Sequence, residues 1–382
     1  MAQFMCPPTC QEVPDFVTDS QGVVVEEPLL ADPVYDFPHV TVNWPLLQST
    51  FNVPARIMSL FTVHISLSNL SPRVYKKPIK PASPLHRLHA ERIITALLEA
   101  EIIAKAPRRS IFQARSFFVP KSGGRLRLVI DYSFLTPLTS PIKFALPSVL
   151  KVIKRRVPPL DHILLQFDLK AAFYHLPLHQ PHRYRSTFLS HDGQRYIFNK
   201  APMGLSYSVA PCQMLSNVIL TPFRKMGYTS WAHIDNLLLV LPHKALPMVR
   251  QWLNTLQQIG IVCVQVTSSF GLKETQFLGY HFSIVNQSIA ATSERITMMK
   301  ALAEVSLFSL TKKQRQSALG HISDAERNMK TSVYKEMKKA LEERDNKEQV
   351  YVDDKLTIRD IYQKGLLILQ QLGITCDSLV VL

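Results

Sequence analysis

Residues 163–176 read Ile163-Leu164-Leu165-Gln166-Phe167-Asp168-Leu169-Lys170-Ala171-Ala172-Phe173-Tyr174-His175-Leu176. Four of the five residues before Asp168 are apolar, which predicts a buried strand that ends in a carboxylate. We expect a tight turn or short helix over Ala171–Tyr174, which would press an aromatic ring back towards the acid. A charge at the end of an apolar run is costly unless it is paired. A single acid of this kind is therefore usually a salt-bridged or capping aspartate.

A second acid stands in a similar frame. Residues 231–236 read Trp231-Ala232-His233-Ile234-Asp235-Asn236, and an apolar run follows them up to Pro242. Two acids in apolar frames indicate a site for a divalent metal ion in phosphoryl transfer, because hard cations prefer carboxylate oxygens. Asp168 and Asp235 are 67 residues apart in the sequence, so only the tertiary fold can bring them together.

The composition indicates a globular protein with a polyanionic partner. The chain has 382 residues, enough for two or three subdomains, and 44 Lys and Arg against 29 Asp and Glu give a net charge of +15. Nucleic acid is the commonest partner for such a charge, and an anionic membrane surface is the alternative. No apolar run approaches the roughly 20 residues of a membrane span, and no basic amphipathic helix is evident. We therefore expect no membrane partner.

The N-terminus and the cysteines indicate the compartment. Residues 1–8 lack the basic start and apolar core of a signal peptide. The five cysteines are scattered, which favours a reducing environment. Cys6 and Cys10 lack a second ligand pair for zinc and are interpreted as bystanders. We expect an intracellular protein, with cytoplasm and nucleus both open.

The order of elements predicts three regions. Residues 1–82 are expected to form an extended N-terminal arm, with short strands at 23–25 and 40–42. Residues 83–290 should form the mixed α/β core, and residues 291–382 a helical tail. Ser83-Pro84 is a plausible cap and first turn of a helix with apolar spacing up to Ile103, ended by Pro107-Arg108-Arg109.

A β-hairpin is predicted at 116–132, where two apolar runs flank Gly123-Gly124. Its turn and second strand carry Lys121, Arg125 and Arg127. A basic hairpin is usually a solvated edge, but it also suits a triphosphate, because arginine forks match phosphate oxygens.

The remaining elements follow from turn signals and periodicity. We expect a hairpin over 184–198, and a Pro/Gly turn at 201–208 that opens a helix to about residue 225. A strand pair around Asp235, a helix over 248–259 and a strand at 261–266 should follow. The last elements expected are a hairpin strand at 276–282 and charged helices over 293–343.

These segments, in this order, resemble the polymerase core of reverse transcriptases of the hepadnaviral, spumaviral and gypsy-type retroelement branch. The resemblance covers roughly residues 83–340. It depends on the following motifs: Lys143-Phe144-Ala145-Leu146-Pro147, Asp168-Leu169-Lys170-Ala171-Ala172-Phe173-Tyr174-His175-Leu176-Pro177-Leu178-His179, Lys200-Ala201-Pro202-Met203-Gly204-Leu205-Ser206, His233-Ile234-Asp235-Asn236, Phe277-Leu278-Gly279-Tyr280 and Gln316-Ser317-Ala318-Leu319-Gly320-His321.

The resemblance implies an α+β right-hand polymerase with fingers, palm and thumb, an antiparallel palm sheet, and a helical thumb and connection region. It implies an RNA-directed DNA polymerase that uses Mg²⁺, with Mn²⁺ as a substitute, to extend an RNA or DNA primer–template from dNTPs. Other segments of a retroelement polyprotein are implied as partners.

The resemblance also assigns roles to residues. Asp168, Asp235 and Asn236 would be catalytic, and the metal ligands would be Asp168, the backbone carbonyl of Leu169, and Asp235. The dNTP would be bound by Lys121, Arg125, Arg127, Phe173, Met203 and Gly204, with the Phe173 ring excluding a 2′-hydroxyl. The primer grip would be Phe277, Leu278, Gly279 and Tyr280.

Three departures leave two functions open. Asn236 stands where the family has a second acid, His233 replaces a tyrosine, and the lysine expected about eleven residues before Phe277 is missing. The chain is therefore either a polymerase or a catalytically impaired relative that binds nucleic acid or serves as a scaffold or subunit. A plain basic structural protein explains neither the acids nor Phe173.

Two further patterns resemble functional motifs but are not interpreted as functional sites. Tyr351-Val352-Asp353-Asp354 spells the family's Tyr-x-Asp-Asp, but no apolar strand follows it, so we interpret it as a surface turn. His175, His179 and His182 suggest zinc, but we do not expect them to converge.

Overall fold

The computed structural model describes residues 28–67, 77–78, 81, 83–106, 110, 112–121, 123–138, 146, 158–266, 272–286 and 288–292. It also describes the backbone of three two-residue strands, β1 (Val17–Thr18), β2 (Val24–Val25) and β3 (Val74–Tyr75). The helical tail expected at 291–382, the Tyr351–Asp354 pattern, and the Lys143–Pro147 motif apart from Leu146 lie outside the described residues.

The centre of the fold is a four-stranded antiparallel sheet. Its order is β10 (Thr229–His233), β11 (Asn236–Pro242), β7 (His162–Leu169) and β12 (Cys263–Gln265). Because side chains alternate along a strand, Ile163, Leu165 and Phe167 share one face of β7 and join the main core. Asp168 lies on the opposite face. The strand expected to end in Asp168 and the strand pair around Asp235 are both confirmed.

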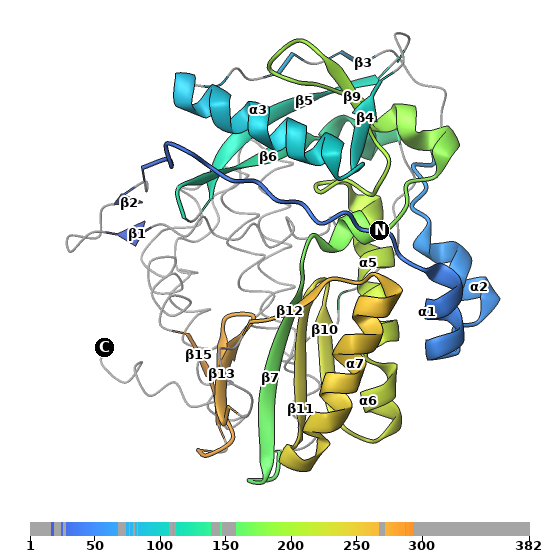
Figure 1. The fold of residues 1–382 in the computed structure, drawn as a ribbon, viewed down its shortest axis with the longest axis vertical. Coiled ribbons are helices and arrows are strands. Elements are labelled where there is room, and N and C mark those ends of the chain that lie inside the picture. Colours follow the sequence, from blue (N-terminus) through green and yellow to red (C-terminus); the bar gives the residue numbers. More distant parts are fainter. Residues whose placement is uncertain are drawn as a thin grey trace, which may run out of the picture.

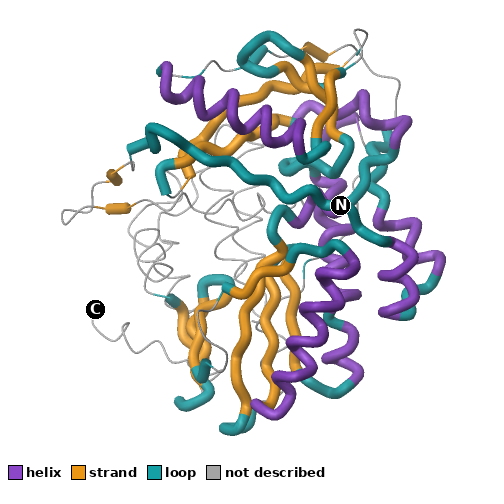
Figure 2. The backbone as a smooth tube through the Cα atoms, viewed as in Figure 1, coloured by secondary structure: helices purple, strands orange, loops and turns teal. Residues whose placement is uncertain are grey.

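Helices cover the apolar face of this central sheet, as Figures 1 and 2 show. They are α5 (Ser206–Ile219), α6 (Thr221–Lys225) and α7 (Leu246–Ile259), with the short 3₁₀ helix η5 (His243–Ala245) before α7. The Trp252 ring packs edge-on against Phe167 and Phe223. The single helix expected up to about residue 225 is instead two helices, because Pro222, in the first turn of α6, cannot donate the backbone hydrogen bond that would continue α5.

The second layer is a six-stranded mixed sheet. Its main path is β3-β5-β8-β9-β4, and β6 pairs with β5. The strands are β4 (Ile103–Lys105), β5 (Phe112–Lys121), β6 (Arg125–Asp131), β8 (Phe188–Leu189) and β9 (Arg195–Phe198). The expected β5–β6 hairpin is confirmed, and both Gly123 and Gly124 have positive φ in its turn.

Helix α3 (Pro84–Glu99) lies across the six-stranded sheet (Figure 1). The predicted cap is confirmed, since the Ser83 side chain accepts from the backbone N–H of His86 at 3.2 Å. The helix ends earlier than the apolar spacing suggested. Ile103 pairs with Phe198 in strand β4, so its burial comes from the sheet and not from a helix.

Three 3₁₀ helices complete the core: η2 (Ser133–Leu138), η3 (Ala172–His175) and η4 (Gln180–Ser186). The short helix expected after Asp168 is confirmed by η3. The hairpin expected over 184–198 is confirmed only from Phe188 onwards, because residues up to Ser186 belong to η4.

The N-terminal segment, defined as residues 28–67, is not the extended arm expected from the sequence. It contains α1 (Trp44–Phe51), α2 (Ala55–Met58) and the 3₁₀ helix η1 (Ser59–Phe61). Val40 and Val42 are buried without forming the expected strand, and Asn43 N–H donates to the Ile259 carbonyl at 2.8 Å. The segment is therefore part of the core.

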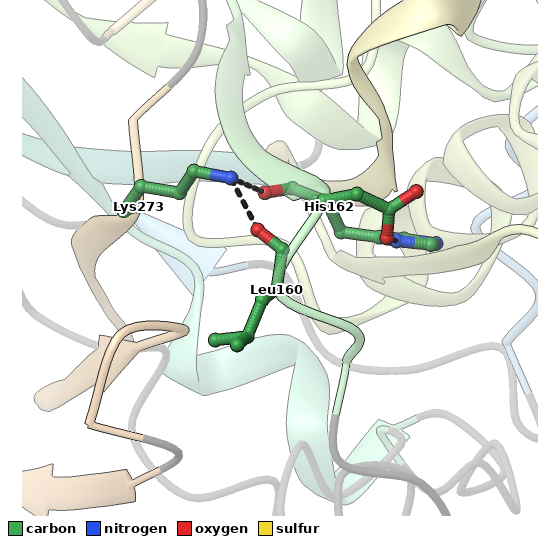
Figure 3. Close-up of polar contacts among 4 residues, drawn as sticks. Leu160, His162 and Lys273 are labelled. Atoms are coloured by element: carbon green, nitrogen blue, oxygen red, sulfur yellow. Dashed lines mark hydrogen bonds and ion pairs between the residues drawn. The ribbon is translucent and has the colours of Figure 1, made fainter.

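A third sheet packs beside the N-terminal half of β7. It has the order β13 (Glu274–Phe277), β14 (Tyr280–Ser283) and β15 (Ser288–Ala291), and the hairpin strand expected over 276–282 is instead two strands joined by a turn at Leu278 and Gly279. The Lys273 Nζ donates to the carbonyls of Leu160 and His162 at 2.6 and 2.7 Å, which fixes the hairpin to β7 (Figure 3). Among the described residues, no helix has the length and apolar character that crossing a membrane requires.

Candidate active site

The register of the central sheet brings the two predicted acids together. Asp168 is the Cα partner of Asn236 across β7 and β11, and the Leu169 N–H donates to the Asp235 carbonyl at 3.0 Å. Asp168, Asp235 and Asn236 are all half-buried. Residues far apart in the sequence therefore form one acidic edge, at the end of β7 and the turn between β10 and β11.

The β10–β11 turn consists of Ile234 and Asp235. The φ of Ile234 is +56°, in the left-handed region that a β-branched residue rarely adopts. Such a conformation persists only where the surroundings enforce it. The side chain of Ile234 is buried, with 7% of its surface exposed.

Helix α5 supplies the groups that enforce this turn. The buried Gln213 accepts from the Ile234 N–H at 2.8 Å and donates to the Ala232 carbonyl at 2.9 Å. The Ser216 hydroxyl donates to the Ile234 carbonyl. Sequence reasoning missed both residues. The available signal was that two polar side chains fall on the buried face of an apolar helix, where they need partners.

The electrostatics of the acidic edge follow from its neighbours. The Asn236 Nδ2 donates to Asp235 Oδ1 at 3.2 Å. Burial, helped by the negative charge of Asp168, raises the pKa of Cys263 to about 12. Burial and the Asp235 charge likewise raise the pKa of Cys212. Both thiols therefore stay protonated at neutral pH.

The three basic residues of the β5–β6 hairpin lie in two different places. Lys121 and Arg125 pair directly beside the hairpin turn and are exposed. Arg127 is half-buried, and its charge opposes the rise that burial causes in the pKa of Tyr174. Since Tyr174 belongs to η3, Arg127 is near the segment that follows Asp168, whereas Lys121 and Arg125 are at the hairpin tip.

The other predicted nucleotide-site residues lie where the two sheets meet. Phe173 is in η3 and is 9% exposed. Gly204 has a φ of +81°, and a Cβ there would lie 3.2 Å from the Ile130 carbonyl of β6. Both the φ and the close approach favour glycine. Met203 beside it is 38% exposed.

The predicted primer-grip residues form the β13–β14 turn. Phe277 and Tyr280 are buried, and Leu278 and Gly279 have φ of +52° and +78°. The Thr292 N–H donates to the Gly279 carbonyl at 3.1 Å. The hairpin is joined to β7 by the bridge between Leu164 and Leu272, and by Thr275, whose hydroxyl donates to Gln166 Oε1 at 3.2 Å.

The expectation for the histidines was wrong in part. His175 is buried, and its Nε2 accepts from the Val262 N–H at 3.0 Å. His179 and His182 do converge, and their partner is His64 of the N-terminal segment, not His175.

A further polar network missed by the sequence supports the β5–β6 hairpin. The buried His89 of α3 bonds to the Tyr35 hydroxyl at 2.7 Å and to the Leu30 carbonyl at 2.8 Å. The same Tyr35 oxygen accepts from the Leu126 N–H at 2.7 Å. The N-terminal segment thereby connects α3 to the strand that carries Arg125 and Arg127.

Sequence comparisons relate the chain to retroelements. No family model matches it. Over 263 residues, or 68% of this chain, it is 24% identical to the Transposon Tf2-7 polyprotein of Schizosaccharomyces pombe (strain 972 / ATCC 24843), and the Transposon Tf2-3 polyprotein of the same organism matches equally. The match covers 19% of each polyprotein, so the chain spans about a fifth of the length of the curated relatives it matches.

Structural comparisons identify the fold. The foamy viral protease-reverse transcriptase in complex with double-stranded DNA has a TM-score of 0.58 at 16% identity, over 89% of this chain and 73% of that one. The same kind of enzyme in complex with an RNA/DNA hybrid also has a TM-score of 0.58, at 15% identity, over 90% of this chain and 48% of that one. The expected α+β polymerase fold with an antiparallel central sheet is confirmed: the chain has a reverse transcriptase-like fold and is similar in sequence to retrotransposon polyproteins.

Proposed function

We propose that the chain is the polymerase core of an RNA-directed DNA polymerase, which extends an RNA or DNA primer–template from dNTPs. The observation that carries the proposal is the register of β7 and β11. It places Asp168 opposite Asn236, and the Leu169 N–H bonded to the Asp235 carbonyl holds the two acidic segments together. The net charge of +15 suits a nucleic-acid partner.

The donor set of the acidic edge fits Mg²⁺, with Mn²⁺ as a substitute. Asp168, Asp235 and the backbone carbonyl of Leu169 would hold the ions, since hard cations prefer oxygen ligands. When bound, the ions would neutralise charge on the phosphates and activate the primer 3′-hydroxyl. The Asn236 amide orients the Asp235 carboxylate through its hydrogen bond but adds no charge.

The surrounding residues would position the nucleotide. Arg127, near η3, is the best placed of the three basic residues to bind a phosphate within the site. Lys121 and Arg125, at the exposed tip, would reach the phosphates only if the hairpin closes over the substrate. Phe173 is buried in η3, and its ring would exclude a 2′-hydroxyl from the nucleotide site. Met203 and Gly204 would line the nucleotide pocket, and Phe277–Tyr280 would hold the primer.

A second candidate is a catalytically impaired relative that binds nucleic acid or serves as a subunit. One observation favours it: Asn236 stands at the Cα position opposite Asp168, and its amide donates to Asp235. An acid there would add a negative charge and a second oxygen, so the present site should bind metal ions more weakly.

Primer extension on a homopolymer RNA template, with Mg²⁺ and with Mn²⁺, separates the candidates. The variants are Asp168→Asn, Asn236→Asp and, as a matched control, Asp192→Asn at the exposed β8–β9 turn. We expect Asp168→Asn to lose at least about a hundredfold in rate, because a metal ligand contributes several kcal/mol. We expect Asn236→Asp to extend the primer faster than wild type, and Asp192→Asn to extend it at the wild-type rate.

The outcomes are distinct. If wild type does not extend the primer but Asn236→Asp does, the result supports the catalytically impaired relative. Silence in all variants, with the primer–template still bound, supports the subunit role. If wild type is active and Asp168→Asn is equally active, the site assignment is wrong. In any active form, Phe173→Val should admit ribonucleotides.

A further inference from the structure

Three histidines from distant parts of the chain form a cluster away from the acidic edge. His64 belongs to the N-terminal segment, His179 precedes η4, and His182 lies within η4. One ligand nitrogen from each ring lies within 4.8 Å of the other two. The ring centroids are 4.3 Å apart for His64 and His179, and 4.7 Å apart for His179 and His182. We call these residues the three-histidine cluster.

The backbone explains why the rings meet. Val63 and Leu178 form a parallel bridge, in which the Val63 N–H donates to the Pro177 carbonyl and the His179 N–H donates to the Val63 carbonyl, both at 2.9 Å. This bridge sets residues 64 and 179 side by side. The His182 N–H donates to the His179 carbonyl at 2.8 Å, and residues three apart overlie each other in a 3₁₀ helix. The cluster is therefore built by regular structure.

One ring nitrogen of the cluster lacks a partner. The His182 Nδ1 is buried and makes no hydrogen bond within the described part of the chain. A buried polar atom without a partner is costly and calls for an explanation, such as an absent ion. Burial also lowers the pKa of His182 to about 4, so the ring keeps its lone pair at neutral pH.

The side chains around the three-histidine cluster limit which ion it could bind. The Arg185 guanidinium is close enough to disfavour a protonated His182, but it donates to the Ile65 carbonyl and lies over the Tyr184 ring. Arg183 donates to the Leu178 carbonyl and to Asn199. Three imidazoles without a carboxylate suit a borderline transition metal such as zinc, and not Mg²⁺ or Ca²⁺.

We propose that the three-histidine cluster binds one Zn²⁺ ion through one nitrogen of each ring. Zn–N bonds are about 2.0–2.1 Å long, which puts tetrahedral ligand nitrogens about 3.3 Å apart. The nitrogens lie within 4.8 Å of one another, and the His64 and His179 rings are stacked with 28° between their planes, so the exposed His64 ring would have to rotate to turn its nitrogen towards a shared ion. His64 is exposed, so the fourth position faces solvent and would take a water molecule.

The ion would tie the N-terminal segment to η4. The Val63–Leu178 bridge and the Arg185 bond to the Ile65 carbonyl already join the two segments, and a shared metal would add a cross-link between parts that are far apart in the sequence. The role we propose for the ion is structural, because it would join segments that are distant in the sequence and so stabilise the fold. This role is independent of polymerase activity.

The test uses the full chain without a histidine tag, made metal-free and kept in excess Mg²⁺ to occupy the palm acids. Zn²⁺ is titrated in competition with a chromophoric chelator, and Co²⁺ is used as a spectroscopic probe of coordination. The variants are His64→Gln, whose side chain is exposed, and His182→Gln. The control is His281→Gln, a half-exposed histidine of β14 that lies beside Glu274. Circular dichroism of each metal-free variant checks the fold.

We expect one equivalent of Zn²⁺ in wild type and control, with an intense tetrahedral Co²⁺ spectrum and a melting temperature that rises with Zn²⁺. Affinity should fall at least about tenfold in either cluster variant, because one of three ligands is lost. The proposal is overturned if wild type binds no stoichiometric Zn²⁺. It is also overturned if both cluster variants bind Zn²⁺ as tightly as the control does.

Discussion

Two hairpin turns of the molecule place a bulky aliphatic residue in the left-handed region. Ile234 leads the β10–β11 turn with a φ of +56°, and Leu278 leads the β13–β14 turn with a φ of +52°. A non-glycine residue in this region costs on the order of 1–3 kcal/mol. The two turns differ in how that cost is offset.

The β13–β14 turn is favoured by its own sequence. Gly279 follows Leu278 and also has a positive φ, as in the type I′ turns that match the twist of paired strands. In the β10–β11 turn, Ile234 alone has a positive φ, and glycine is the usual residue in such a place. That turn depends on Gln213 and Ser216 of α5. The acidic edge is therefore shaped by a helix and not by local preference.

Acid should weaken the four-stranded central sheet before the β13–β14 hairpin. The His175 ring supports β12 through Val262, and burial lowers its pKa to about 4. The unfolded chain has the ordinary histidine pKa near 6.5, so it binds more protons between pH 6.5 and 4. The contribution of neutral His175 to the free energy of unfolding is thus complete above pH 6.5. The free energy of unfolding falls by about 3 kcal/mol as the pH drops towards 4.

Urea unfolding near pH 7 and near pH 4 measures this loss. His175→Gln keeps an acceptor for the Val262 N–H but cannot titrate, so its stability should depend less steeply on pH. His182 also has a lowered pKa, so part of the pH dependence of stability should remain in His175→Gln. Hydrogen exchange at low pH should show opening at β12 before β13. An unchanged pH dependence in His175→Gln would contradict the assignment.

Replacing Gln213 tests whether α5 enforces the β10–β11 turn. Gln213→Met keeps the volume but leaves the Ile234 N–H and the Ala232 carbonyl buried without partners. We expect a loss of about 2–3 kcal/mol in the free energy of unfolding, together with slower primer extension. Chemical denaturation measures the first effect. Gln276→Met, at an exposed position of β13, is the matched control and should change stability by less than about 0.5 kcal/mol. Equal effects would remove the distinction between the turns.

The same substitution should have opposite signs in the two turns. Asparagine tolerates positive φ, and Asn-Gly is a preferred type I′ pair, so Leu278→Asn should stabilise by about 0.5 kcal/mol. Ile234→Asn also relieves strain, but it removes a side chain buried in the main core and should cost a net 1–2 kcal/mol. Thermal unfolding of both variants checks the signs. A gain at both positions would show that burial of Ile234 contributes little.

Local signals predicted the elements whose partners are close in the sequence. The Gly123-Gly124 hairpin, the Ser83 cap and the strand ending at Asp168 all depend on short-range turn, capping or alternation patterns. The Phe277–Tyr280 hairpin came instead from the resemblance to a polymerase motif, since the residues by themselves had predicted one strand over 276–282.

Elements with distant partners were missed or misread. Val40 and Val42 have no periodic context, and they are buried because they pack next to the end of α7, more than 200 residues later. The helical spacing up to Ile103 suggested a longer helix, but pairing with β9 converts its end to a strand. Sequence spacing also could not show that His64 is the partner of His179 and His182.

The sequence by itself determined which residue types were available: two acids at the ends of apolar runs, a basic hairpin, and an aromatic ring five residues after the first acid. The tertiary structure alone decided that Asp168 lies opposite Asn236, that α5 holds Ile234 in a strained turn, and that three histidines meet. The reason is physical: strand register and helix packing are set by burial summed over the whole core, and no short stretch of sequence contains that sum.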